Sequence, residues 1–435
     1  MSTAIAQVPS SLTGSGARTA VVAQAGLALV TLAAAYFAAP VLGLALPGSA
    51  LVLVGIGAVA VVALPERAIA LSVATGIAAL VWMRPGYAAY HVALVGTLFL
   101  ARRRTWTLAL TLALGALLVP KLLFWGFYAR PAFYQWLHEP ALAAAIFITV
   151  YWWREARDRR LPPQASGGAA PLAQWGALFL LPTHACYPIA FGPGDLWRGR
   201  RVEAGAVLRG VALFSAKAAA LVALRAAFPD HGFSARPAHA VLALPLPQLW
   251  IVVALNYVEL VLVLSGVADV AVVIARLYGW PLPSPFRWAL LAWNPVELWR
   301  RWGIYTRRFL LKTVYFPLGG STRHQLLNVM ATFMASALVL HSGWLGSKYW
   351  QVGPGGWRDH SLYFLLQGVA VCACLVTWQV RGKQPSADRA LRWSWGRVPA
   401  TVATQAMSAL LHVIILAQSL SFADRWRLIA RCLGL

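Results

Sequence analysis

The chain has 435 residues, of which 60% are hydrophobic and 11% are charged, and its formal net charge is +24. Soluble domains have roughly a quarter of charged residues, so this composition excludes an ordinary soluble protein and indicates an integral membrane protein. The basic residues form short clusters between apolar runs, which favours cytoplasmic loops facing anionic lipid headgroups and disfavours nucleic acid as a partner. The four cysteines show neither metal-ligand nor disulfide spacing, so we expect no metal site and no cofactor.

The first part of the chain is expected to be a series of membrane spans behind a short tail. Residues 1–20 are rich in Ser, Thr, Gly and Ala and predict a flexible tail. The apolar runs that follow are long enough to cross a bilayer as helices and are separated by Pro, Gly and Arg. We expect spans near residues 21–46, 49–64, 68–83, 87–100 and 106–128.

Residues 172–200 interrupt this alternation of spans and loops. One full crossing would place the basic residues at its end on the opposite side from the preceding basic loop. Its Pro and Gly residues therefore predict a broken or re-entrant element, which a membrane tolerates only where protein or a water-filled cavity covers the freed backbone. We expect this segment to line a cavity, with His184 and Asp195 as its polar members; a structural hydrogen bond is the alternative role for each.

Further spans are expected near residues 205–228 and 239–264, and the second run continues to about residue 280. Glu259 and Asp269 lie inside this apolar run, where an ionisable group is costly and usually faces the interior of the bundle. On one continuous helix they would project about 80° from each other and could share a polar seam that lines a cavity. A structural pairing with basic residues is the alternative.

Residues 294–297, Asn-Pro-Val-Glu, predict the start of a helix. Asn is a favoured cap, Pro is favoured at the first helical position, and Glu297 could reach back to the cap amide. Leu298, Trp302, Tyr305 and Phe309 then recur at helical spacing, which predicts one amphipathic helix lying in the membrane interface. Its basic residues could bind headgroups or an anionic ligand, with positive-inside topology as the alternative role: Arg300, Arg301, Arg307, Arg308 and Lys312.

The next element is expected to carry a histidine into the bilayer. Residues 316–321 predict a turn, and an apolar helix from about Thr322 leads to His341. A histidine buried there without a counter-charge is a candidate functional group, because its near-neutral pKa suits proton transfer to or from a hydroxyl. The residues alone leave a proton relay or a transport role open.

The C-terminal part is expected to contain two more spans, near residues 361–380 and 400–419, with His412 packed in the second. The last residues read as a basic amphipathic tail at the membrane surface.

Four motifs in this part of the chain resemble those of the membrane-bound O-acyltransferase family, in particular its bacterial branch of alginate O-acetylation and teichoic acid D-alanylation proteins. The order and approximate spacing match over about residues 180 to 345, with Phe191-Gly192-Pro193 as a further matching element upstream. Gly303 stands where that branch has His and many eukaryotic members have Asn, and Leu340 stands where the branch has Trp. The motifs are Ser265-Gly266-Val267-Ala268-Asp269, Leu298-Trp299-Arg300-Arg301-Trp302-Gly303, Tyr315-Phe316-Pro317-Leu318-Gly319-Gly320 and Val339-Leu340-His341-Ser342-Gly343.

The resemblance implies a fold and a domain organisation. The fold would be an all-α polytopic membrane protein, a bundle of about 10 to 12 transmembrane helices with interfacial and re-entrant helices. N-terminal transmembrane helices would occupy residues 21–160, the family's core residues 171–346, and further helices with the basic tail residues 347–435.

The resemblance also implies an activity. An acyl group, such as acetyl, would pass from a cytoplasmic thioester donor, acyl-coenzyme A or an acyl carrier protein, to a hydroxyl of a cell-surface polysaccharide or partner protein. His341 would be the general base, the basic residues of segment 300–312 would hold the donor's phosphates, and Asn294 or His324 would supply a second polar group in place of Gly303.

The implied setting is the inner membrane of a bacterium, with lipids, the donor, and periplasmic esterase-like or polysaccharide-synthesis proteins as partners. The alternative is a catalytically silent scaffold or partner subunit of a membrane export complex. A secondary transporter is disfavoured because no matching pair of broken spans occurs in the two halves of the sequence.

Overall fold

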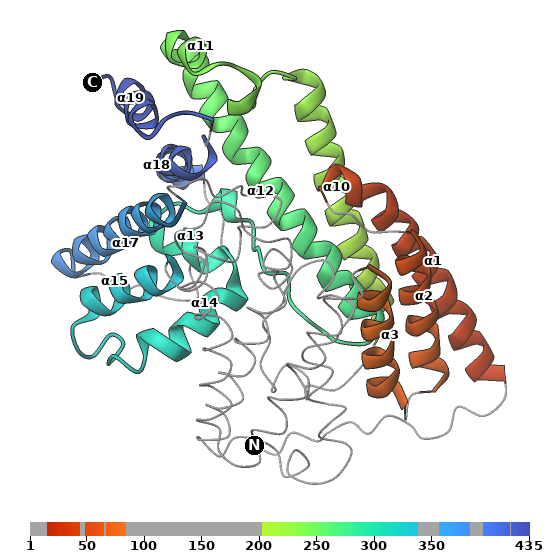
Figure 1. Cartoon of the computed structure of the whole chain (residues 1–435). Coiled ribbons are helices and arrows are strands. Elements are labelled where there is room, and N and C mark those ends of the chain that lie inside the picture. The colour runs from red at the N-terminus through yellow and green to blue at the C-terminus, as the bar shows by residue number, and fades with distance from the viewer. Residues whose placement is uncertain are drawn as a thin grey trace.

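The computed structural model describes residues 15–43, 48–64, 67–83, 202–337, 356–382, 395–417 and 419–435. Within these ranges every regular element is a helix and none is a strand, which confirms the all-α class (Figure 1). Several predicted features lie outside the described residues: the spans near 87–100 and 106–128, His184 and Asp195 of segment 172–200, Leu340 and His341.

Five of the described helices are long and apolar enough to cross a membrane. They cover Arg18–Val41, Ala204–Ala227, Leu246–Leu277, Arg358–Val380 and Trp395–Leu416. The chain is therefore a polytopic membrane protein, and the total of about 10 to 12 spans stays a prediction.

The N-terminal helices α1 (Ser15–Val41), α2 (Gly48–Ala63) and α3 (Ala68–Met83) pack side by side in chain order (Figure 1). Helix α1 begins inside the region 1–20 that the sequence suggested to be a tail. A buried glutamine of α1, Gln24, donates from Nε2 to the backbone oxygen of Leu277 at 2.9 Å, and Tyr278 donates its hydroxyl to the oxygen of Val54 at 2.8 Å. These bonds join the N-terminal helices to the end of the central helix α12.

Helices α10 (Ala204–Ala227) and α12 (Leu246–Leu277) form the most extensive helix pair among the described elements. With 32 residues, α12 is about 48 Å long at 1.5 Å per residue, which exceeds the ~30 Å hydrocarbon layer. The expected single span from residue 239 is wrong. The structure has a separate short helix, α11 (Ala238–Ala243), because Leu244 precedes Pro245 and is held in an extended conformation that ends a helix.

The expected single amphipathic helix after Asn294 is also wrong. The chain forms α13 (Pro295–Arg301), which ends before Gly303. It continues as α14 (Ile304–Leu310) and a π-helical turn, η6 (Leu311–Tyr315). Gly303 has φ 56° and ψ 55°, a left-handed conformation that glycine adopts without steric cost.

The remaining helices pack on one another around α17 and α18. Helix α15 (Gln325–Ala335) begins three residues after the expected start and contacts α17 (Gly356–Val380), which also contacts α13 and α18 (Val398–Leu416). Helix α18 contacts both α12 and the C-terminal helix α19 (Phe422–Cys432).

Helix α19 is anchored more firmly than a surface tail. It packs on α11, α12 and α18, and its residue Arg425 is buried and points inward. The Arg425 Nη1 atom lies 2.7 Å from a carboxylate oxygen of Asp359, in the first turn of α17, and 2.7 Å from the backbone oxygen of Ile414. The sequence predicted that this arginine lies at the membrane surface. It lies inside the bundle instead, where the oxygens of Asp359 and Ile414 accept hydrogen bonds from its guanidinium.

Candidate functional site

The α13 start has the expected cap. Asn294 accepts a hydrogen bond from the amide of Glu297 through its side-chain oxygen, at 2.8 Å, and Pro295 occupies the first helical position. Glu297 does not reach back toward the cap. Its carboxylate accepts from Arg301 Nε at 2.8 Å one turn later, because a guanidinium is a stronger partner than a backbone amide.

Arg301 is therefore part of the framework of α13. Its side chain and that of Glu297 are both buried, and its guanidinium also lies 5.2 Å from the ring centroid of Trp293. We leave Arg301 out of the candidate anion site, since a buried guanidinium held by a carboxylate has little capacity for another anion.

Arg307 of α14 lies among other basic residues of this segment. Burial lowers the pKa of its guanidinium, and the charges of Arg300, Arg308 and Arg287 lower it further, while Glu297 acts in the opposite direction. Of the charged groups among the described residues that act on the Arg307 guanidinium, three are cations and one is an anion, Glu297, which pairs with Arg301 and also lies 3.9 Å from Nη1 of Arg300. This arrangement attracts an anion such as a phosphate.

The loop before α13 contributes to the same cluster. The amide of Arg287 donates to the oxygen of Arg301 at 2.9 Å, and the amide of Ile304 donates to the oxygen of Pro285 at 3.0 Å. These bonds hold the loop beside the α13–α14 junction. We call Arg287, Arg300, Arg307 and Arg308 the cationic cluster; Lys312 lies just beyond it in η6.

The junction at Gly303 supplies no side chain, although a small one would have room. A Cβ atom placed there would meet its nearest neighbours, the Cβ and Oγ1 of Thr306, at 4.0 Å. The obstacle to substitution is therefore the left-handed backbone rather than space, and Asn is the residue after Gly that tolerates it best.

Two tryptophans fix the junction to the bundle. Trp299 packs edge-on against Phe333 of α15 at 5.1 Å between ring centroids and donates from Nε1 to Gln367 of α17 at 3.2 Å. Trp302 packs edge-on against Phe286 at 5.3 Å and lies 5.8 Å from the ring of His412 in α18.

The sequence predicted that His412 is packed, and its 3% exposure confirms this. Its Nδ1 lies 2.7 Å from the backbone oxygen of Ser408, which can only accept, so Nδ1 carries a proton. Its Nε2 then accepts from the Tyr363 hydroxyl at 2.9 Å. The Tyr257 ring lies 4.9 Å away, so His412, Tyr257 and Trp302 form an aromatic layer that joins α12, α18 and the α13–α14 junction.

The turn after η6 depends on a residue that the sequence reasoning missed. Asn328 of α15 is buried and donates from Nδ2 to the backbone oxygens of Gly320 and Arg323, at 2.9 Å and 2.6 Å. An amide in an otherwise apolar helix was the available signal. His324, a candidate second polar group, precedes α15 in a left-handed conformation with an exposed side chain and makes no side-chain cap bond.

Glu259 and Asp269 lie on one continuous helix, α12, and each pairs with a basic residue of α10. Asp269 is 2% exposed, with Lys217 Nζ and Ser284 Oγ each 2.5 Å from its carboxylate. Glu259 accepts from Nε and Nη2 of Arg225 at 2.9 Å and 2.7 Å. The residues are about 15 Å apart along the helix axis, and the structural pairing considered as the alternative is present at both.

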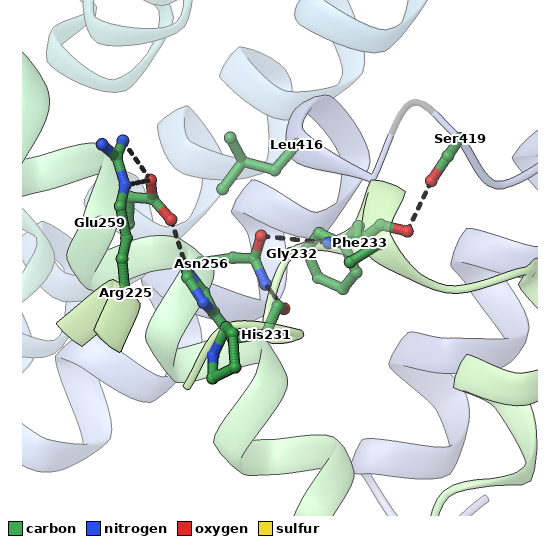
Figure 2. A pocket seen from close by; sticks show the side chains of 10 residues that line it. Arg225, His231, Gly232, Phe233, Asn256, Glu259, Leu416 and Ser419 are labelled. Carbon is green, nitrogen blue, oxygen red and sulfur yellow. Dashed lines mark hydrogen bonds and ion pairs between the residues drawn. The ribbon is translucent and has the colours of Figure 1, made fainter. Parts of the chain in front are cut away.

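Only Glu259 of these two acids lines a pocket of about 550 Å³ that the described residues enclose (Figure 2). The pocket lies where the C-terminal ends of α10 and α18 meet the first half of α12. We call it the α10–α18 pocket. Its lining residues are Arg225, Pro229, His231, Gly232, Phe233, Ala235, Asn256, Glu259, Leu416 and Ser419.

Comparison with known proteins gives one distant similarity. No protein-family model matches the chain. The sequence is 28% identical over 148 residues to a peptidoglycan O-acetyltransferase of Helicobacter pylori, and this match covers 33% of the chain. The chain spans 27% of the length of that protein. The similarity supports a distant relationship to O-acyltransferases, and membership of the membrane-bound O-acyltransferase family stays a prediction.

Proposed function

We propose that the chain is a membrane-bound O-acyltransferase, which moves an acyl group, such as acetyl, from a thioester donor to a hydroxyl of a cell-surface polymer. The observation that carries this proposal is the cationic cluster at the α13–α14 junction, where the Leu298–Gly303 motif that resembles the family ends. The membrane-spanning helices and the similarity to a peptidoglycan O-acetyltransferase support it.

The cationic cluster would hold the donor. Acyl-coenzyme A and the prosthetic arm of an acyl carrier protein both join a phosphate group to a thioester, so one guanidinium cluster suits either. Arg307, Arg300 and Arg308 would bind the phosphate, with Arg287 and Lys312 adding positive charge. The donor enters as a substrate, and the proposal requires no cofactor.

His341 would be the general base. It would take the proton of the acceptor hydroxyl as that oxygen attacks the thioester carbonyl; the carbon–sulfur bond then breaks, and the departing thiolate receives a proton. Asn294 uses its side-chain oxygen to cap α13, so His324, with its exposed side chain, is the better candidate for a second polar group.

The proposed setting is the inner membrane of a bacterium, with the donor on the cytoplasmic side. Lipids would surround the spans. A periplasmic esterase-like protein or a polysaccharide-synthesis protein could receive or supply the acceptor.

A second candidate function is a catalytically silent scaffold of an export complex. The absence of a side chain at Gly303 favours it, because this position carries a polar side chain in the family that the sequence resembles.

Turnover of acetyl-coenzyme A by the purified full chain in nanodiscs, with an added disaccharide or water as the acyl acceptor, tests the proposal. We expect release of free thiol that is abolished in His341→Ala while the melting temperature stays unchanged. We expect Arg307→Gln to raise the KM for acetyl-coenzyme A about tenfold with a smaller change in kcat.

The matched control is Arg427→Gln, which removes a guanidinium that is 71% exposed on a different helix, α19. Full activity in His341→Ala would contradict the proposed role of His341 as general base. If the wild-type protein releases no thiol, the catalytically silent scaffold becomes the better-supported function.

A further inference from the structure

The α10–α18 pocket has a fixed polar wall. Arg225 binds Glu259 through two of its nitrogens, and the Nε2 atom of His231 lies 2.5 Å from the other carboxylate oxygen. The Nδ1 atom of His231 contacts the backbone oxygen of Phe228. Figure 2 shows these side chains joined in one row along the wall, which holds the Glu259 carboxylate from two sides.

The loop that closes the pocket is fixed as well. Asn256 donates from Nδ2 to the oxygen of His231 at 2.7 Å, and Ser419 donates its hydroxyl to the oxygen of Phe233 at 2.9 Å. Because α12 and the chain after α18 both hold this loop, the pocket is formed before any ligand enters. Preformed pockets of about 300 to 1,000 Å³ are typical of small-molecule sites.

The polar wall remains accessible. The side chain of Arg225 is 44% exposed and that of Glu259 is 24% exposed, in contrast to the sealed pair of Lys217 and Asp269. A ligand can therefore reach a donor and an acceptor that lie side by side.

The pocket adjoins the aromatic layer at the α13–α14 junction. Leu416, in its lining, is one helical turn after His412, and Asn256 directly precedes Tyr257. His412 and Tyr257 pack together, and His412 lies beside Trp302. The pocket and the junction that bears the cationic cluster are thus neighbours through one layer of rings.

The pocket lies at the end of the bundle that we assign to the non-cytoplasmic side. It is at the C-terminal end of α10, whose other end follows the basic residues 198–201, and at the C-terminal end of α18, which follows the basic residues 381–397. Basic loops mark the cytoplasmic side, so both helices point their pocket ends away from it.

We infer that the α10–α18 pocket binds the carbohydrate that accepts the acyl group; this inference rests on the proposed function. Neighbouring sugar hydroxyls can donate to a carboxylate and accept from a guanidinium at the same time, which matches Glu259 and Arg225. The mutual pairing of the two charges disfavours a strongly anionic ligand. Pro229, Phe233 and Leu416 supply the apolar surface that covers the C–H face of a sugar ring.

Direct binding to the full chain in nanodiscs tests the inference without requiring turnover. Saturation-transfer NMR is measured with three disaccharides: the peptidoglycan repeat, a mannuronate pair and cellobiose. We expect at least one to bind, and Glu259→Gln to weaken that binding about tenfold or more, since a hydrogen bond to a charged group is lost. Absence of binding by all three overturns the inference, as does equal binding in Glu259→Gln.

The matched control is Asp269→Asn, which alters the other acid of α12 that pairs with α10 but lines no part of this pocket. We expect its glycan binding to match that of the wild type at a temperature where thermal unfolding shows both variants to be folded; an equal loss in both folded variants would mean that helix pairing, not ligand contact, explains the effect. Should Glu259→Gln fail to fold, Leu416→Trp fills the pocket from α18 and leaves the ion pair intact. Normal glycan binding in that variant overturns the inference.

Thiol release from acetyl-coenzyme A, measured on the same samples, separates this inference from the proposed function. Glycan binding without thiol release would support the carbohydrate site and contradict the proposed acyltransferase activity. Thiol release without glycan binding would support the activity and contradict the carbohydrate site.

Discussion

Two ion pairs connect the same two helices, α10 and α12, in opposite ways. The side chains of Lys217 and Asp269 are 15% and 3% exposed, and Ser284 also bonds the carboxylate. Arg225 and Glu259 are 44% and 24% exposed and border a pocket. The difference shows that ionisable residues of one membrane-spanning helix can be sealed inside the bundle or left exposed beside a pocket, and that their surroundings decide between the two.

The comparison has an energetic consequence. A buried pair holds its partners strongly because loss of one leaves the other charge without compensation, whereas an exposed pair contributes little. Two substitutions along α10 test this gradient, and a third on the same helix tests its close contact with α12.

The largest effect is expected at Lys217. Replacing it by Met removes the cation and leaves Asp269 buried beside Ser284, which should lower the free energy of unfolding by about 3 to 5 kcal/mol. The measurement is denaturant unfolding in one fixed detergent. Combining Lys217→Met with Asp269→Leu should recover most of the loss, because neither charge of the pair then remains. If Lys217→Met were as stable as the wild type, the buried pair of Lys217 and Asp269 would not stabilise the fold.

A smaller effect is expected at Gly210, where α10 packs tightly against α12. A Cβ atom there would lie 2.3 Å from Cγ2 of Val273, so Gly210→Ala should cost about 1 to 3 kcal/mol through overpacking. Gly205→Ala is the control on the same helix, since its Cβ would meet only the flexible end of Arg209 at 3.4 Å. Thermal unfolding of both variants should separate them, and equal midpoints would argue against the close crossing.

Much of the helical framework could be predicted from the sequence. Apolar runs of sufficient length identified α1, α2, α3, α10, α17 and α18, because a span must satisfy its own backbone polar groups. The cap at Asn294 was predicted correctly for a similar reason: its requirements are local.

The breaks in helices were harder to predict. The apolar spacing of Leu298, Trp302, Tyr305 and Phe309 continues through Gly303. It therefore predicted one helix, whereas the left-handed backbone of Gly303 separates α13 from α14. Pro245 split the expected span at residue 239 in the same way. In both cases one residue with special backbone preferences outweighed the side-chain pattern.

The partners of polar residues could not be predicted at all. Asp269 pairs with a residue 52 positions away in the chain, and Arg425 with one 66 positions away. The sequence shows that such groups need partners, but only the packing of helices selects them. For the same reason Arg301 appeared equivalent to Arg300, although the structure buries it against Glu297.

The smallest effect is expected at Arg225. Arg225→Gln removes the cation of the exposed pair, but His231 still contacts the Glu259 carboxylate, so the free energy of unfolding should fall by less than about 1 kcal/mol. Unfolding in the same detergent as Lys217→Met makes the two pairs comparable. Glycan binding should weaken more than the stability of the fold, because the Arg225 guanidinium supplies the hydrogen-bond donor beside Glu259. A loss of stability as large as that of Lys217→Met would show that both pairs are structural and would remove the distinction on which the pocket is assigned to a ligand.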